Sequence, residues 1–229
     1  MKEKIKSIVD YTLLGVAFLA ILILGIIEKQ NIINMIPALL GLFVYLLAAK
    51  AFRIAYIFGA INSALYSIGY FMQGLYGNAF VNLFLYVPLQ IFTFIQWSKQ
   101  KYKQATKFKR LPLKYELLLF GGAIIAWLVC WYVLSILPGS SSVPALDAIA
   151  TVSGPITATI TMFALMETIG YELLLTGSNA VMWIILLITN PANITYLIST
   201  CFTLYCQISK TFTWIKLYRE QNAELAMKN

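Results

Sequence analysis

Eight stretches of mostly apolar residues, each long enough or nearly so to cross a bilayer, constrain this chain more than any other feature. They lie at 9–27, 33–50, 54–75, 79–97, 115–137, 145–166, 168–189 and 193–214. A helix needs about 20 apolar residues to cross the hydrocarbon core, and it satisfies its backbone polar groups internally. The chain is 60% hydrophobic and 11% charged, far from the composition of a soluble domain. The sequence therefore predicts an all-α integral membrane protein with about eight transmembrane helices.

The basic residues predict the orientation of these helices. With a cytoplasmic N-terminus, all but Lys29 of the 17 Lys and Arg residues fall in cytoplasmic segments, as the positive-inside rule requires. An odd number of spans would place the basic C-terminal segment on the wrong side. We therefore expect a multi-pass protein of the cell membrane with both termini cytoplasmic and the first span retained. Membrane topology accounts for the net charge of +8, and the sequence indicates no nucleic-acid partner.

A basic segment at 98–114 separates two blocks that resemble each other weakly. The last helix of each block has a Gln (Gln90, Gln207) followed by Thr, Phe and Trp before a Lys. We predict a single membrane domain with these parts: an extra N-terminal helix (9–27), a three-helix repeat (33–97), a cytoplasmic loop (98–114), a linker helix (115–137), a second three-helix repeat (145–214) and a cytoplasmic tail (215–229). One helix between two such blocks leaves them parallel, which places a substrate site where they meet. Alternatively, the Trp-Lys endings mark only the membrane interface.

Polar residues on the span 168–189 form a stripe with helical spacing. Glu172, Thr176, Asn179 and Trp183 follow one another at intervals of four, three and four residues, and therefore lie on one face. Hydrocarbon would leave the carboxylate and the amide unsatisfied, so this face is predicted to line the protein interior or a wet cavity. We expect a ligand site there, with Trp183 offering a flat face to an aromatic ring. The alternative is adhesion between helices, which Gly170 and Gly177 would permit.

Other spans contribute similar residues to the predicted site. They are Asn62, Asn82, Tyr86, Gln90, Thr200 and Gln207. Amides, hydroxyls and tyrosines suit a neutral or singly charged solute that carries rings and hydroxyl groups. A phosphate is not expected, because Lys and Arg occur in the spans only near their cytoplasmic ends. Pro88 and Pro155 should open the backbone ladder and bend their helices.

Catalysis and metal binding are not indicated. The chain has no His, and its three cysteines lie in apolar stretches without CxxC spacing. Asp147 and Glu172 are expected near opposite membrane faces, where they cannot act as a catalytic pair. We therefore predict a protein that is not an enzyme and has neither a metal nor a cofactor.

Three segments resemble the PnuC family of vitamin-type transporters, which is named for nicotinamide riboside uptake. They are LYGNAFVNLFLYVPLQIFTFIQW (75–97), DAIATV starting at Asp147, and NITYLISTCFTLYCQISKTFTWIKL (193–217). The resemblance covers most of 50–217 and implies a parallel-repeat, SWEET-like arrangement of three, one and three helices. It also implies facilitated diffusion without ATP or ion coupling, with the substrate trapped by a cytosolic kinase. The absence of a P-loop and of a chain of buried carboxylates agrees with this.

One departure from the family bears on the substrate. Nicotinamide riboside carriers share a W-x-x-W-x-x-x-N pattern, and the matching positions here are Ile169, Glu172 and Thr176. The carboxylate could attract a pyridinium cation, or it could accept hydrogen bonds from a neutral nucleobase or a sugar. We therefore expect a nucleoside or deoxynucleoside first, nicotinamide riboside close behind, and thiamine or riboflavin third.

A different class of function is a substrate-binding subunit of an ATP-driven vitamin importer. The segment 98–114 would then be a docking surface for the energising partner. Otherwise it is a solvated loop that contacts anionic lipid. The sequence also allows a homo-oligomer.

Overall fold

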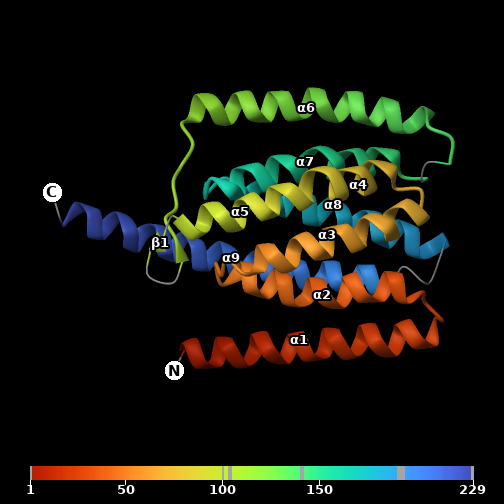
Figure 1. Cartoon of the computed structure of the whole chain (residues 1–229), viewed down its shortest axis with the longest axis horizontal. Helices are drawn as coiled ribbons and strands as arrows, with labels where there is room; N and C mark the ends of the chain where they lie inside the picture. Colours follow the sequence, from red (N-terminus) through yellow and green to blue (C-terminus); the bar gives the residue numbers. More distant parts are fainter. Residues whose placement is uncertain (1, 100, 103–104, 140–141, 190–193, 228–229) are drawn as a thin grey trace.

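The computed structural model describes all residues except 1, 100, 103–104, 140–141, 190–193 and 228–229, and it is a bundle of long helices (Figure 1). The predicted start of the last span at 193 lies outside the described residues. The long helices are α1 (Lys2–Ile27), α2 (Ile32–Ala49), α3 (Ala55–Met72), α6 (Leu113–Ile136), α7 (Pro144–Met162), α8 (Thr168–Thr189) and α9 (Ile194–Ala226). The fourth predicted span consists of three consecutive pieces, α4 (Tyr76–Val81), the π-helix η1 (Asn82–Tyr86) and α5 (Val87–Lys99).

Within the described residues, each of the eight predicted spans thus corresponds to a helical segment, and five are long and apolar enough to cross a membrane by themselves. These five lie in α1, α2, Tyr76–Lys99, α6 and α8. The other three, α3, α7 and α9, carry more polar residues. Many of those side chains are buried inside the protein, among them Asn62, Asp147 and Gln207. Polar side chains inside the bundle therefore contribute to the lower hydropathy of these helices.

Helices α1 and α6 lie outermost on opposite sides of the bundle (Figure 1). α1 packs against α2 and α9, whereas α6 packs mainly against α7. Only Leu134 of α6 is buried, and large apolar side chains such as Leu118 and Ile125 are exposed. Such a surface suits contact with lipid tails. The start of α1 and the end of α9 lie at the same end of the bundle (Figure 1).

The predicted bend at Pro88 takes the form of a π-helical turn. Proline cannot donate a backbone hydrogen bond, and its ring clashes with the carbonyl four residues earlier. The turn before it is widened, and the Val87 N–H donates to the Asn82 carbonyl five residues back. π-Helical turns are frequent at functional sites, and this one carries two predicted site residues, Asn82 and Tyr86. Helix α7, by contrast, continues through Pro155.

The segment 98–114 is anchored to the bundle. It contains two short antiparallel strands, β1 (Lys101–Tyr102) and β2 (Ala105–Thr106), followed by Phe108. The Phe108 ring is 4% exposed and lies 4.5 Å from the Trp214 ring and 6.2 Å from the Trp97 ring. A parallel β-bridge then joins Lys109 to Leu165 in the α7–α8 connection. The interpretation as a solvated loop is therefore wrong for the part around Phe108, because an aromatic cluster binds it.

The last helix is longer than predicted. Helix α9 continues to Ala226, through most of the predicted tail at 215–229. The tail also supports the segment 98–114, because the buried Gln221 accepts a 2.9 Å hydrogen bond from the Phe108 N–H. The two parts predicted to be cytoplasmic are thus joined by a direct contact.

Candidate functional site

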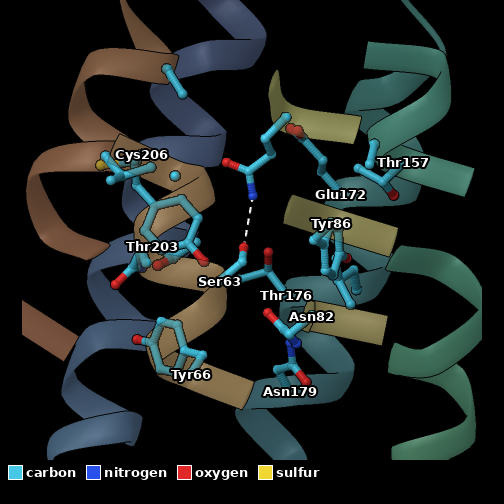
Figure 2. A pocket seen from close by; sticks show the side chains of 18 of the residues that line it. Ser63, Tyr66, Asn82, Tyr86, Thr157, Glu172, Thr176, Asn179, Thr203 and Cys206 are labelled. Carbon is cyan, nitrogen blue, oxygen red and sulfur yellow. Dashed lines mark hydrogen bonds between the residues drawn. The ribbon is translucent and has the colours of Figure 1, made fainter. Parts of the chain in front are cut away.

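A cavity of about 190 Å³ lies inside the bundle between α2, α3, the α4–η1–α5 segment, α7, α8 and α9 (Figure 2). Its walls include every residue that the sequence analysis assigned to the site: Asn62, Asn82, Tyr86, Gln90, Glu172, Thr176, Asn179, Trp183, Thr200 and Gln207. Helical spacing places such residues on one face of a helix, and the tertiary structure turns these faces toward one space. That they bind a substrate stays a prediction.

Some polar atoms on the wall have no hydrogen-bond partner within the described part of the chain. These unpaired atoms are the buried Oδ1 atoms of Asn62 and Asn179 and the hydroxyl of Tyr56. Buried polar groups are nearly always hydrogen-bonded, since an unsatisfied one is costly. The amide oxygens are therefore suited to accept hydrogen bonds from the N–H or O–H groups of a solute.

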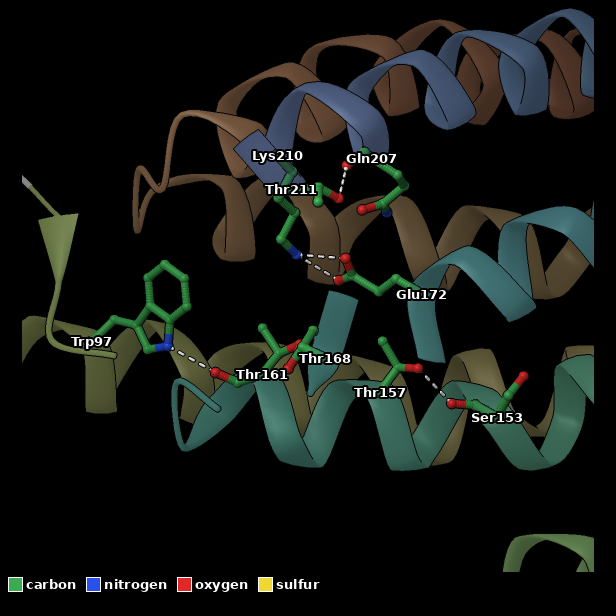
Figure 3. A network of polar contacts seen from close by, with 9 residues as sticks. All are labelled: Trp97, Ser153, Thr157, Thr161, Thr168, Glu172, Gln207, Lys210 and Thr211. Atoms are coloured by element: carbon green, nitrogen blue, oxygen red, sulfur yellow. Dashed lines mark hydrogen bonds and ion pairs between the residues drawn. The ribbon is translucent and has the colours of Figure 1, made fainter. Parts of the chain in front are cut away.

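Glu172 is held by an ion pair that the sequence analysis missed. The Lys210 ammonium lies 2.6 Å from both Glu172 carboxylate oxygens (Figure 3), and the exposed fractions of the two side chains are 4% and 13%. The Lys210 Nζ atom also lies 3.9 Å from the centroid of the Trp214 ring. The positive-inside pattern predicts Lys210 among the cytoplasmic charges, whereas its side chain lines the cavity. The spacing on α9 could have predicted this position of Lys210. It follows Gln207 by three residues and precedes Trp214 by four, so it lies on the same face of the helix.

Aromatic rings form part of the cavity wall. The Trp183 ring lies parallel to the Tyr196 ring at 4.4 Å, and to the Tyr70 ring at 5.9 Å. Trp183 is 1% exposed. The prediction that its ring offers a free flat face is therefore wrong, because neighbouring tyrosines cover it. The ring forms part of a cluster with Tyr66, Tyr70 and Tyr196 that lines the cavity.

Glycines allow close contacts at two of the predicted site residues. A Cβ atom at Gly59 would lie 1.8 Å from Gln90 Oε1, and one at Gly154 would lie 2.1 Å from the Tyr86 hydroxyl. Gln90 also donates a 2.8 Å hydrogen bond to Ser63 (Figure 2).

The glycines of α8 behave differently from the expectation of helix adhesion. A Cβ atom at Gly170 or Gly177 would meet nothing within 4 Å. These two glycines therefore mark no close helix contact.

Asp147 belongs to a separate polar group. Its Oδ1 atom accepts hydrogen bonds from the backbone N–H of Asn78 at 3.1 Å and from the Asn78 side-chain amide at 2.5 Å. Asn78 lines the cavity, so Asp147 orients a wall residue from behind. In the described part of the chain, no three His, Cys, Asp or Glu residues are grouped so that they could hold a metal ion.

Comparison with known proteins shows which family this chain resembles in sequence and in fold. Residues 31–216 match the sequence profile of a family described as nicotinamide mononucleotide transporter. The nicotinamide riboside transporter PnuC of Neisseria mucosa is 22% identical over 200 residues, which cover 82% of this chain and 74% of that protein. A crystal structure of the vitamin B3 transporter PnuC superposes with a TM-score of 0.78 at 20% identity and covers 92% of both chains. The last comparison shows that the fold is shared.

Proposed function

We propose that this chain, which belongs to the nicotinamide mononucleotide transporter (PnuC) family of membrane proteins, carries nicotinamide riboside by facilitated diffusion. The sequence alone favours a nucleoside or deoxynucleoside, with nicotinamide riboside close behind. The comparisons favour the second of these, because the relatives are named for nicotinamide riboside and vitamin B3.

The composition of the cavity wall is the observation that supports this substrate. Nicotinamide riboside carries a cationic pyridinium ring, a carboxamide and ribose hydroxyls. The aromatic cluster around Trp183 suits the cation, and the free amide oxygens of Asn62 and Asn179 suit the hydroxyl and amide donors. In this proposal the pyridinium ring lies against the aromatic cluster and the ribose lies against the amide oxygens.

The riboside fits this wall better than the mononucleotide does. A phosphate is usually bound by free Arg or Lys side chains or by a helix N-terminus. Lys210 is the one basic side chain among the described lining residues, and both oxygens of Glu172 already engage it. A phosphate would have to break this buried pair.

The transport mechanism proposed here is alternating access between two parallel three-helix repeats. The cavity would face one side of the membrane at a time, and a cytosolic kinase would trap the arriving substrate. No energy source beyond the substrate gradient is required.

Reconstitution of the purified chain in liposomes tests the proposal. We expect downhill uptake of labelled nicotinamide riboside without ATP and without an ion gradient, and saturation by unlabelled substrate. Binding without uptake would instead support a subunit of an ATP-driven importer. Uptake of thymidine or uridine in preference to nicotinamide riboside would restore the nucleoside interpretation.

A further inference from the structure

The charges on the cavity wall are the starting point. Glu172 and Lys210 are the two formally charged side chains among the described residues that line it. The remaining polar wall is built from amides and hydroxyls, such as Asn82, Thr176 and Gln207. The net charge that a substrate meets is therefore set by this pair.

The geometry of the pair shows that it is a closed ion pair. The ammonium contacts both carboxylate oxygens at 2.6 Å, and the Trp214 ring lies on it at 3.9 Å. Both side chains are largely removed from solvent, so water screens the pair weakly. The carboxylate thus presents little net negative charge to the cavity.

We infer that Lys210 is a specificity-determining residue: by neutralising Glu172, it lets the cavity accept a neutral aromatic riboside as well as a cationic one. Without Lys210, Glu172 would be an unpaired anion in the wall and would favour a cation strongly, since Coulomb interactions are large at low dielectric. This inference rests on the proposed function, because it concerns the ring charge of the transported riboside.

The test compares two ligands that differ by one ring atom. Nicotinamide riboside has a cationic ring nitrogen, and benzamide riboside has a neutral carbon at that position. Calorimetry on detergent-purified protein gives the ratio of their affinities. We expect the wild-type protein to bind both, and Lys210→Met to shift the ratio toward the cation by roughly tenfold or more.

A double variant separates charge from shape. Glu172→Gln combined with Lys210→Met removes both charges, so the wild-type ratio should return. Lys50→Met is the matched control, because Lys50 is also paired with a carboxylate (Asp10, 3.8 Å) but does not line the cavity. Its ratio should equal that of the wild type.

The outcomes distinguish the two proposals. An unchanged ratio in Lys210→Met, or an equal shift in the double variant, would overturn the role of Lys210 while leaving the proposed function intact. Failure of the wild-type protein to bind either riboside would overturn the proposed function and this inference with it. If Lys210→Met does not fold, Glu172→Gln at about pH 6 should shift the ratio toward the neutral ligand by roughly tenfold, and an unchanged ratio there would be decisive against the inference.

Discussion

The surroundings of Asn179 determine whether its side chain can bind a solute. Its amide oxygen is buried beside the cavity without a partner in the described structure. The next residue back, Ser178, donates to the Leu175 carbonyl of its own helix and does not line the cavity. Of these two neighbouring polar residues on α8, Ser178 is satisfied within its own helix, whereas the amide oxygen of Asn179 is available to a solute.

Replacing Asn179 by Leu should weaken nicotinamide riboside binding by about fivefold to tenfold, because one hydrogen bond of about 1 kcal/mol is lost. Calorimetry on purified protein measures this change. Ser178→Ala is the control and should bind as the wild type does. Equal affinities in the Asn179 variant and the wild type would remove Asn179 from the site.

Gly154→Ala should displace the Tyr86 side chain, because the added methyl group would lie 2.1 Å from its hydroxyl. We expect a loss of stability of about 1–3 kcal/mol together with weaker substrate binding. Thermal unfolding and calorimetry report the two effects. Gly177→Ala, which meets nothing within 4 Å, should leave both unchanged or raise stability slightly. A loss of stability at Gly177 equal to that at Gly154 would contradict this explanation.

At the level of secondary-structure elements, the segment 98–114 contacts helices from both predicted three-helix repeats. Phe108 packs into a cluster with Trp97 of α5 and Trp214 of α9, and its backbone bonds to Gln221. Trp97 in turn donates a 2.9 Å hydrogen bond to the Thr161 carbonyl of α7 (Figure 3). Elements from both predicted repeats therefore meet at this cluster, at the end of the bundle where the chain begins and ends.

Phe108→Ala should reduce the free energy of unfolding by about 3–5 kcal/mol, as expected when a buried aromatic ring is truncated. It should also expose the segment 98–114 to proteases. Thermal unfolding and limited trypsin digestion measure these effects. Phe92, which is 56% exposed on α5, provides the control Phe92→Ala, which should change neither measurement. A Phe108 variant as stable as the control would show that the segment is not anchored through this ring.

At the scale of the whole molecule, the arrangement of charge predicts orientation. The two ends of the described chain lie at one end of the bundle (Figure 1), and most basic residues belong to segments near that end. Anionic lipid and the positive-inside rule favour a cytoplasmic position for this end. The orientation of the termini, the parallel repeats and a homo-oligomer stay predictions.

Cysteine labelling tests the orientation. In a variant without the three native cysteines, Glu28→Cys should react with a membrane-impermeant maleimide in intact cells. Asn222→Cys should react only after the membrane is permeabilised. Both positions are exposed, so a lack of labelling would not reflect burial. The reverse pattern of labelling would invert the topology.

The periodicity of apolar and polar residues along the sequence was sufficient to predict the spans and the faces of the site-forming helices. Glu172, Thr176 and Asn179 share a face because an α-helix turns once in 3.6 residues, and this holds whatever surrounds the helix. The resemblance to the family also came from local sequence, and the profile match confirms it.

Which side chains contact each other across different helices depends on the tertiary structure and could not be predicted from the sequence. Lys210 is 38 residues from Glu172, and the covering of Trp183 by Tyr196 depends on how α8 and α9 pack. The docking of Phe108 likewise depends on contacts between distant segments. Periodicity defines a direction around one helix axis, whereas the identity of the facing side chain depends on the rotation and depth of another helix, which packing sets.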